Sequence, residues 1–247
     1  MRKKRWVPYA LGIGLWLVPL GDLHADNYEV CAEWINKCDV CGNANLSCRD
    51  DTASGLYDTL KAHGYTGLFK YGNSLAWESD FKKANDANYI DACDIAIHAD
   101  HGNHCVFGFG NTTHDNCYLW ASETEWGNSD LEWIVQDDCS TIARNFNWTC
   151  WTGAFKGLHL IMGFDTGAHD SCTRGQKLAD KLVAGWTVVQ AWFYAAEQTE
   201  GAGTYAAVVG AGNSSSNVYN DHIWGHGSVS ADPYPASYYW WTNHSCD

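Results

Sequence analysis

Two stretches of sequence decide the fold: Asp94-Ile95-Ala96-Ile97-His98-Ala99-Asp100-His101-Gly102 and Leu131-Glu132-Trp133-Ile134-Val135-Gln136-Asp137-Asp138-Cys139. Each contains an apolar run with the length and composition of a buried β-strand. The first run leads into His101-Gly102, and the second leads into Cys139. Because reactive groups of open α/β sheets lie beyond the carboxyl ends of the strands, we expect the imidazole and the thiol at one sheet edge.

An imidazole beside a thiol is the basis of a nucleophilic site. The thiol attacks only as thiolate, so a neighbouring imidazole must accept or stabilise its proton. We assign His101 and Cys139 as catalytic residues, with the backbone N–H groups of Gly102 and Cys139 as donors to an oxyanion. Three carboxylates are candidates for supporting the imidazole, although solvated aspartate is the ordinary alternative: Asp100, Asp138 and Asp165.

The rest of the chain alternates between strand-like and helix-like segments. Strands are expected at 28–34, 67–71, 94–98, 131–136 and 157–163, with a further one at 205–209, and helices at 53–63, 176–184 and 188–198. Apolar strands separated by helices indicate an α/β fold, a three-layer sandwich with a mostly parallel central sheet. No linker or repeat interrupts the pattern, so we expect residues 26–247 to form a single domain.

Residues 1–25 have the features of a secretory signal peptide. A basic segment, 2–5, precedes a mostly apolar run, 6–20, and Leu23-His24-Ala25 is an acceptable cleavage site. An uncleaved membrane anchor is the alternative, but the run is short for a bilayer span and contains proline and glycine. We expect a secreted or periplasmic protein that leaves the membrane after signal cleavage.

The net charge of the chain is −14. A surface of this sign repels nucleic acid and anionic lipid, so neither is expected as a partner. The charge itself does not identify a substrate, and the sequence does not indicate an oligomeric state.

The chain has eleven cysteines, and export into an oxidising compartment predicts that most form disulfides. An odd number leaves at least one thiol, which we assign to Cys139 because a nucleophile must stay reduced. An intermolecular disulfide or a buried inert thiol is the alternative for this cysteine.

The pairing of the other cysteines is open at this point. Cys31, Cys38, Cys41 and Cys48 are symmetrically spaced and are expected to close a local loop, with zinc or redox chemistry as the alternative. The neighbouring pairs Cys105–Cys117 and Cys150–Cys172 are expected only from their nearness in sequence.

A second arrangement of metal-ligand residue types lies after the first decisive strand. His98, His101 and His104 are spaced by three, and Cys105 follows. At a strand end this spacing does not place three ligands on one face, so we expect no metal and no cofactor.

The order of these segments resembles the caspase-like superfamily of cysteine peptidases (clan CD), which includes gingipains, legumains, separases and CHAT domains. The resemblance rests on the two stretches quoted above, on 157–164, and on the helical return at 177–195, and it is weaker over 28–70. It implies a caspase-like fold in which His101 and Cys139 form the dyad. The whole chain is also similar to a family of exported bacterial and archaeal proteins, to which we attach no activity.

One position departs from the family pattern. Nucleophiles of the superfamily usually follow a small residue, whereas Asp138 precedes Cys139 here. A carboxylate beside the thiol raises the thiol pKa, unless a charged His101 compensates.

The sequence therefore predicts an exported cysteine-dependent hydrolase of the peptidase type, acting on peptide or protein substrates. The alternative is a non-catalytic extracellular protein that binds peptide or glycan on the same fold, which the aspartate and the many tryptophans favour. A metal-dependent hydrolase is a third class.

Overall fold

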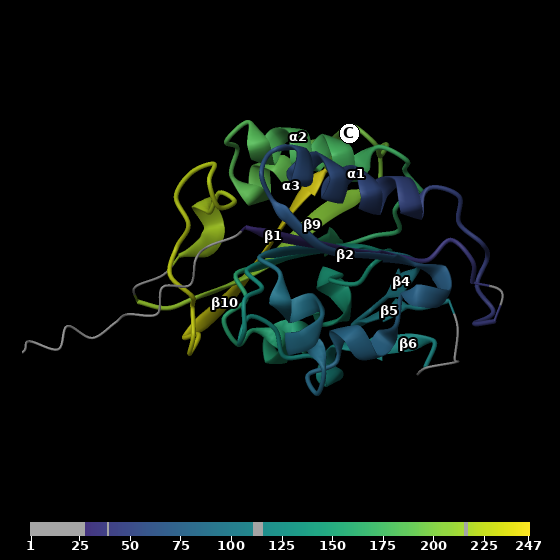
Figure 1. Cartoon of the computed structure of the whole chain (residues 1–247), viewed down its shortest axis with the longest axis horizontal. Coiled ribbons are helices and arrows are strands. Elements are labelled where there is room, and N and C mark those ends of the chain that lie inside the picture. The colour runs from purple at the N-terminus through teal and green to yellow at the C-terminus, as the bar shows by residue number, and fades with distance from the viewer. Residues whose placement is uncertain (1–27, 39, 111–115, 215–216) are drawn as a thin grey trace, which may run out of the picture.

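A computed structural model describes residues 28–38, 40–110, 116–214 and 217–247, so the expected signal peptide lies outside the described residues. Its centre is a seven-stranded sheet in the order β10-β9-β8-β7-β3-β1-β2 (Figure 1). Five strands are parallel: β1 (Glu29–Trp34), β2 (Thr66–Gly72), β3 (Ile95–Ala99), β7 (Trp133–Asp137) and β8 (Leu160–Phe164). At one side, β9 (Tyr205–Gly212) and β10 (Tyr238–Ser245) continue the sheet in antiparallel pairs.

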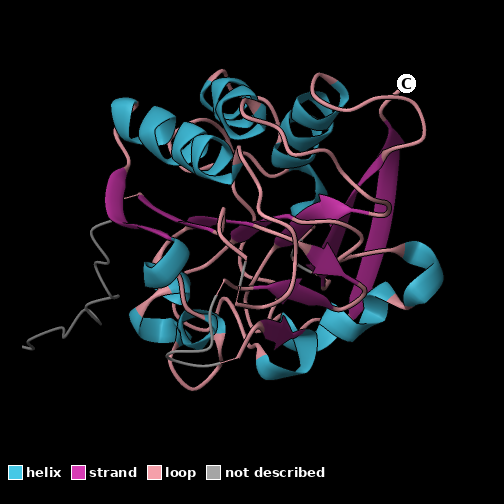
Figure 2. Cartoon of the chain, turned by 90° about the vertical axis from the view of Figure 1, so that its right-hand side faces the viewer, coloured by secondary structure: helices cyan, strands magenta, loops and turns pink. Residues whose placement is uncertain are grey.

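The three α-helices among the described residues cover one face of this sheet. They are α1 (Arg49–Ala62), α2 (Arg174–Val183) and α3 (Val188–Glu197), and they lie above the strands in Figure 1. The opposite face carries short 3₁₀ helices and a small antiparallel sheet of β4 (Gly102–Asn103), β5 (Val106–Gly108) and β6 (Tyr118–Trp120) (Figures 1 and 2). The expected α/β sandwich with a mostly parallel central sheet is confirmed, and its second covering layer has a different composition from the first.

The short 3₁₀ helices are η1 (Asn73–Leu75), η2 (Glu78–Phe81), η3 (Asp86–Asn88), η4 (Ile90–Ala92), η5 (Ala121–Glu123), η6 (Arg144–Phe146), η7 (Trp148–Ala154) and η8 (Val218–Asn220). Most of them come from segments rich in Asn, Asp and aromatic residues, where no apolar stripe recurs at the α-helical period. Such segments cover the sheet with large side chains rather than with a long helix.

Successive side chains of a strand point to opposite faces of the sheet, so the strands contribute to a separate core on each face. On β1, Val30 and Ala32 pack against the α-helices, whereas Cys31 faces the second layer. The second layer supplies the bulkiest side chains of its core, among them Phe81, Trp126 and Trp151. Every second residue of a central strand is therefore buried on each side, as the continuous apolar runs predict.

Four disulfides connect segments far apart in the sequence: Cys31–Cys93, Cys41–Cys117, Cys48–Cys172 and Cys105–Cys150. The local pairings predicted for Cys105–Cys117 and Cys150–Cys172 are wrong, and so is the local loop of Cys31, Cys38, Cys41 and Cys48. Cys31 lies in β1 and Cys150 in η7, whereas the other bridged cysteines lie in the connections between elements. Each partner is therefore set by tertiary packing rather than by spacing. Disulfides of this number indicate an oxidising environment.

None of the helices in the described ranges has both the length and the apolar character that a bilayer span requires.

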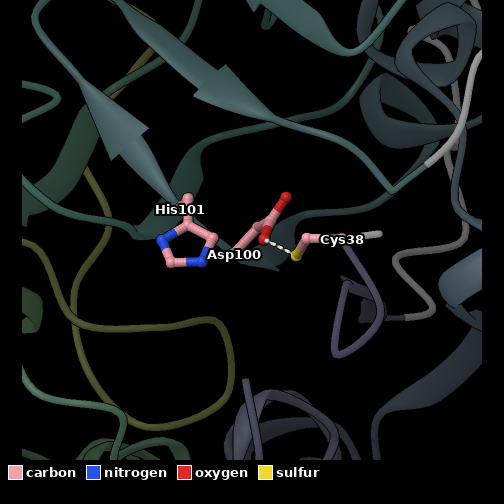
Figure 3. A group of neighbouring side chains, drawn as sticks. All are labelled: Cys38, Asp100 and His101. Carbon is pink, nitrogen blue, oxygen red and sulfur yellow. Dashed lines mark hydrogen bonds between the residues drawn. The ribbon is translucent and has the colours of Figure 1, made fainter. Parts of the chain in front are cut away.

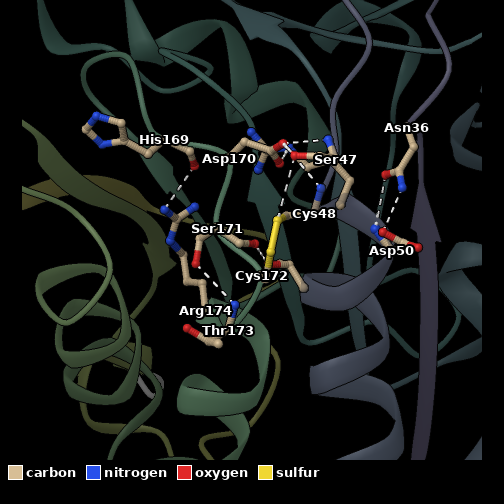
Figure 4. The surroundings of a disulfide bond; sticks show 12 residues. Asn36, Ser47, Cys48, Asp50, His169, Asp170, Ser171, Cys172, Thr173 and Arg174 are labelled. Carbon is tan, nitrogen blue, oxygen red and sulfur yellow. Dashed lines mark hydrogen bonds and ion pairs between the residues drawn. A yellow bond between two sulfur atoms is a disulfide. The ribbon is translucent and has the colours of Figure 1, made fainter.

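The crosslink between Cys48 and Cys172 is expected to contribute strongly to stability. It fastens the start of α1 to the segment before α2 and spans 124 residues (Figure 4). A Cys48→Ala/Cys172→Ala variant should lose about 2–5 kcal/mol of unfolding free energy, because the unfolded chain regains the freedom of a long loop. Denaturant titration without reductant measures this loss, and Cys139→Ala, which breaks no disulfide, is the control. Equal midpoints for the two variants would contradict the assignment.

Candidate functional site

The two decisive strands are neighbours. β3 and β7 pair in parallel with Ala99 opposite Asp137, so the residues that follow each strand emerge at one edge of the sheet. His101 and Cys139 each come two residues after the end of their strand. The structure thus brings the two predicted catalytic residues to the same edge.

Gly102 is where the two loops meet. A Cβ atom at this position would lie 2.6 Å from Asp138 Cβ, 2.7 Å from Thr141 Cγ2 and 2.9 Å from Cys139 O. Only glycine therefore permits this approach of the His101 loop to the Cys139 loop. The Gly108 N–H donates to His101 O at 2.8 Å, and the alternation of an antiparallel ladder then turns the Gly102 N–H away from β5.

Cys139 lies outside the four disulfides and is half-buried. Its Sγ accepts a hydrogen bond from Ala168 N–H at 3.3 Å and lies 3.6 Å from Ala168 O. The next residue, Ser140, has a φ of +55° and donates its N–H to Thr166 O at 2.9 Å. This left-handed turn redirects the chain immediately after β7 and leaves the sulfur at the surface of the edge.

The imidazole of His101 is oriented by a backbone carbonyl. Its Nε2 lies 2.7 Å from Ala44 O, in the loop between β1 and α1. Because a carbonyl oxygen only accepts hydrogen bonds, Nε2 carries a proton in this contact, and the neutral form of the ring has its lone pair on Nδ1. Within the described ranges no hydrogen bond joins His101 to Cys139; hydrogen bonds of a nucleophilic site often form only when substrate binds.

The predicted supporting carboxylates have different surroundings. Asp138 is buried, and its Oδ2 lies 3.2 Å from His98 Nδ1 while its Oδ1 accepts from Asp100 N–H at 2.7 Å. Its charge is therefore engaged by these two partners. Asp165, at the end of β8, accepts from Arg144 N–H at 2.7 Å and from Asn243 Nδ2 at 3.4 Å.

Asp100 directly precedes His101 in the chain. It is fully buried, and its Oδ1 accepts a hydrogen bond from Cys38 Sγ at 3.4 Å. Burial, together with the neighbouring charge of Asp138 and against the attraction of His98, raises the pKa of Asp100 to about 6.

The alternative zinc arrangements foreseen in the sequence are excluded. Cys105 is bound in a disulfide to Cys150, His98 is packed among Phe81, Phe107 and Phe109, and His104 stacks on Phe146. The four-cysteine alternative is excluded as well, because three of its members form disulfides with distant cysteines.

A buried ion-pair network supports the Cys139 loop from the helical side of the sheet. Asp137, the last residue of β7, contacts Arg174 and lies 3.3 Å from Arg49, and Arg174 also contacts Glu200. Burial alone would lower the pKa of Arg49, but Asp137, Asp138 and Asp170 raise it above its usual value. Figure 4 shows Arg174 and Asp170 beside the Cys48–Cys172 disulfide.

A cavity of about 370 Å³ adjoins the edge on the side of the small sheet. His101 and Gly102 form part of its wall, and two partly exposed aromatic side chains, Tyr118 and Trp120, form another part. The remaining lining residues are Asn43, Asn103, Val106, Phe107 and Gly108. A chain segment of a few residues would fit beside the imidazole.

Sequence reasoning missed Ala44, Arg49 and Arg174. Ala44 acts through its carbonyl, a group that every residue carries, so no residue pattern could have identified it. The arginines are missed because arginine is ordinarily a surface residue. Their one sequence signal is that each stands a few residues before a predicted helix and close to a cysteine, Cys48 or Cys172.

Fold and site together define a disulfide-stabilised α/β protein with a thiol and an imidazole at the carboxyl edge of a mostly parallel sheet. The chain belongs to the family described as "Domain of unknown function (DUF6345)", whose model matches residues 32–244. A search of curated proteins found no match.

Two solved structures are similar to this chain at low identity. The Arg-specific cysteine proteinase gingipain R (RGPB) is 12% identical with a TM-score of 0.46, and the match covers 69% of this chain and 42% of that protein. Caspase-1 from Spodoptera frugiperda is 12% identical with a TM-score of 0.41, covering 87% of this chain and 86% of that one. This chain thus spans less than half of the gingipain, and similarities of this size do not assign a function.

Removing Arg174 should destabilise the protein sharply. Arg174→Met leaves Asp137 and Glu200, both fully buried, without this partner, at a cost of about 3–5 kcal/mol in unfolding free energy. Arg144→Met is the matched control, since Arg144 is exposed and stacks on Trp241, and it should cost less than about 1 kcal/mol. Chemical denaturation compares the two, and similar losses would show that the network does not hold the site.

Proposed function

We propose that the protein is an exported cysteine-dependent hydrolase of the peptidase type, in which Cys139 is the nucleophile and His101 the acid–base residue. The proposal rests on the arrangement of side chains at the carboxyl edge of the central sheet. A half-buried cysteine outside the disulfides and an imidazole with a defined tautomer follow adjacent parallel strands.

The Ala44 carbonyl fits this chemistry. By holding the proton on Nε2, it leaves Nδ1 of His101 free to take the thiol proton, the task that an orienting carboxylate performs in other nucleophilic sites. The Ala168 N–H, which donates to Cys139 Sγ, stabilises the resulting thiolate. Asp138 does not oppose the thiolate directly, because its carboxylate is engaged by His98 and Asp100.

The reaction follows from these roles. Cys139 Sγ bonds to the carbonyl carbon of the substrate while its proton moves to His101, and the oxyanion accepts hydrogen bonds from Gly102 N–H and Cys139 N–H. The amine leaves with the proton from His101, and water then cleaves the thioester, which regenerates the thiol. The cavity beside His101, with Tyr118 and Trp120 in its wall, receives the substrate chain.

Export is part of the proposal. The signal-like segment at 1–25 directs the chain out of the cytoplasm, and the four disulfides fit an oxidising destination. A peptide or protein outside the cell is then the substrate, without nucleic acid or membrane as a partner.

Substitution of the dyad tests the proposal. Cys139→Ala and His101→Ala should each lower kcat/KM on a peptide library by about 10³-fold or more, because the thiolate or its base is lost. Cys246→Ser is the matched control, since this buried cysteine also lies outside the disulfides and is placed near the chain end. Circular dichroism checks folding, and cleavage that persists in a folded Cys139→Ala variant would refute the assignment.

A second candidate is a non-catalytic protein that binds peptide or glycan. The exposed aromatic side chains Tyr118 and Trp120 in the cavity wall favour it, since such rings are typical of recognition surfaces. Iodoacetamide titration of the native protein separates the two: rapid labelling of Cys139 at neutral pH supports the hydrolase, and an unreactive thiol supports the binding protein.

A further inference from the structure

A second group of ligand-type side chains meets at the same edge. Cys38, Asp100 and His101 each offer one ligand atom, and these atoms lie within 4.8 Å of one another. They come from two loops, the one that follows β1 and the one that follows β3. In Figure 3 the Nε2 side of the His101 ring is turned toward Asp100 and Cys38.

The group is buried on one side and incompletely bonded. Cys38 and Asp100 are fully buried, and the thiol donates to Asp100 Oδ1 at 3.4 Å. The other oxygen, Asp100 Oδ2, is buried without a hydrogen-bond partner among the described residues. An unsatisfied buried carboxylate oxygen is costly, and a cation bound by this carboxylate would offset that cost.

The surroundings hold these side chains in place. The Cys38 N–H donates to Asn45 Oδ1 at 2.7 Å, and the disulfide Cys41–Cys117 fastens the same loop. The Asp100 N–H donates to Asp138 Oδ1. Outer hydrogen bonds of this kind orient the ligands of metal sites.

The donor set selects a class of cation. A thiolate with an imidazole nitrogen and a carboxylate oxygen suits zinc and similar transition metals, whereas magnesium and calcium prefer oxygen ligands alone. Zinc bonds of about 2.0–2.3 Å put two tetrahedral ligand atoms roughly 3.3–3.8 Å apart. Cys38 Sγ and Asp100 Oδ1 already have this spacing, at 3.4 Å. Three protein ligands leave a fourth position for water.

We propose that Cys38, Asp100 and His101 bind a zinc ion, which places a metal site beside the Cys139 nucleophile. Binding releases the Cys38 thiol proton to solvent, and His101 Nε2 exchanges its proton and its contact with Ala44 O for the metal. A neutral imidazole bound through Nε2 carries its proton on Nδ1. His101 then cannot accept the Cys139 proton, so zinc inhibits hydrolysis; this consequence rests on the proposed function, but the metal site does not.

Direct metal binding is the first test. The Cys139→Ala/Cys246→Ser variant retains Cys38 as its one cysteine outside the disulfides. After dialysis against Zn²⁺, elemental analysis should find one zinc per chain in this variant and in the wild type. Cys38→Ser and Asp100→Asn should bind zinc more than about tenfold more weakly.

Cobalt provides a spectroscopic check that does not depend on folding of the ligand variants. Co²⁺ added to Cys139→Ala/Cys246→Ser should produce a thiolate-to-cobalt charge-transfer band in the near ultraviolet, and that thiolate can only be Cys38. Absence of the band, substoichiometric zinc in the wild type, or unchanged affinity in folded Cys38→Ser would each overturn the site.

The same experiments distinguish a failure of the proposed hydrolase function from a failure of the proposed zinc site. Zinc and cobalt binding are measured in a background that lacks Cys139, so an inactive wild type leaves the metal result intact. If the wild type is active, stoichiometric zinc should abolish cleavage and a chelator should restore it, whereas full activity of the zinc-loaded protein would refute the inhibitory role of His101.

Discussion

The position of the candidate nucleophile depends on the burial of Asp137 between two arginines. This carboxylate ends β7, contacts Arg174 of α2, and lies 3.3 Å from Arg49 of α1. A charge removed from water must be compensated by partners of opposite sign. These ion pairs hold α1 and α2 against the end of β7, and Cys139 follows two residues after Asp137. The loop at the edge is thus anchored by charges that cannot leave their partners without a large penalty.

The sequence predicted the central architecture because its signals are local. Apolar runs and helical spacing place β1, β2, β3, β7 and β8 and the three α-helices close to their observed bounds. The strand β10 was missed, since Tyr238-Tyr239-Trp240-Trp241 follows a proline-containing loop and does not alternate between apolar and polar residues. A layer on each face of the sheet was expected, but the 3₁₀ composition of the second layer was not, because 3₁₀ helices have no apolar period to detect.

The candidate site was predictable only in part, for a related reason. His101, Gly102 and Cys139 could be proposed because each follows a recognisable strand. The Ala44 carbonyl, the partners of Arg49 and Arg174, and every disulfide depend on contacts between segments far apart in the sequence. The contact of the buried Asp138 carboxylate with His98 also joins residues far apart in the sequence. Spacing alone carries no information about such contacts.

The loop after β1 connects the two proposals. It supplies Ala44, whose carbonyl sets the tautomer of His101, and it supplies Cys38, whose thiol lies beside Asp100. An imidazole has two nitrogens, so whatever occupies Nε2 decides whether Nδ1 can accept a proton. A carbonyl at Nε2 leaves Nδ1 basic, and a cation at Nε2 does not. Under the two proposals the same loop favours either state of His101, and the choice between them depends on whether the metal is bound.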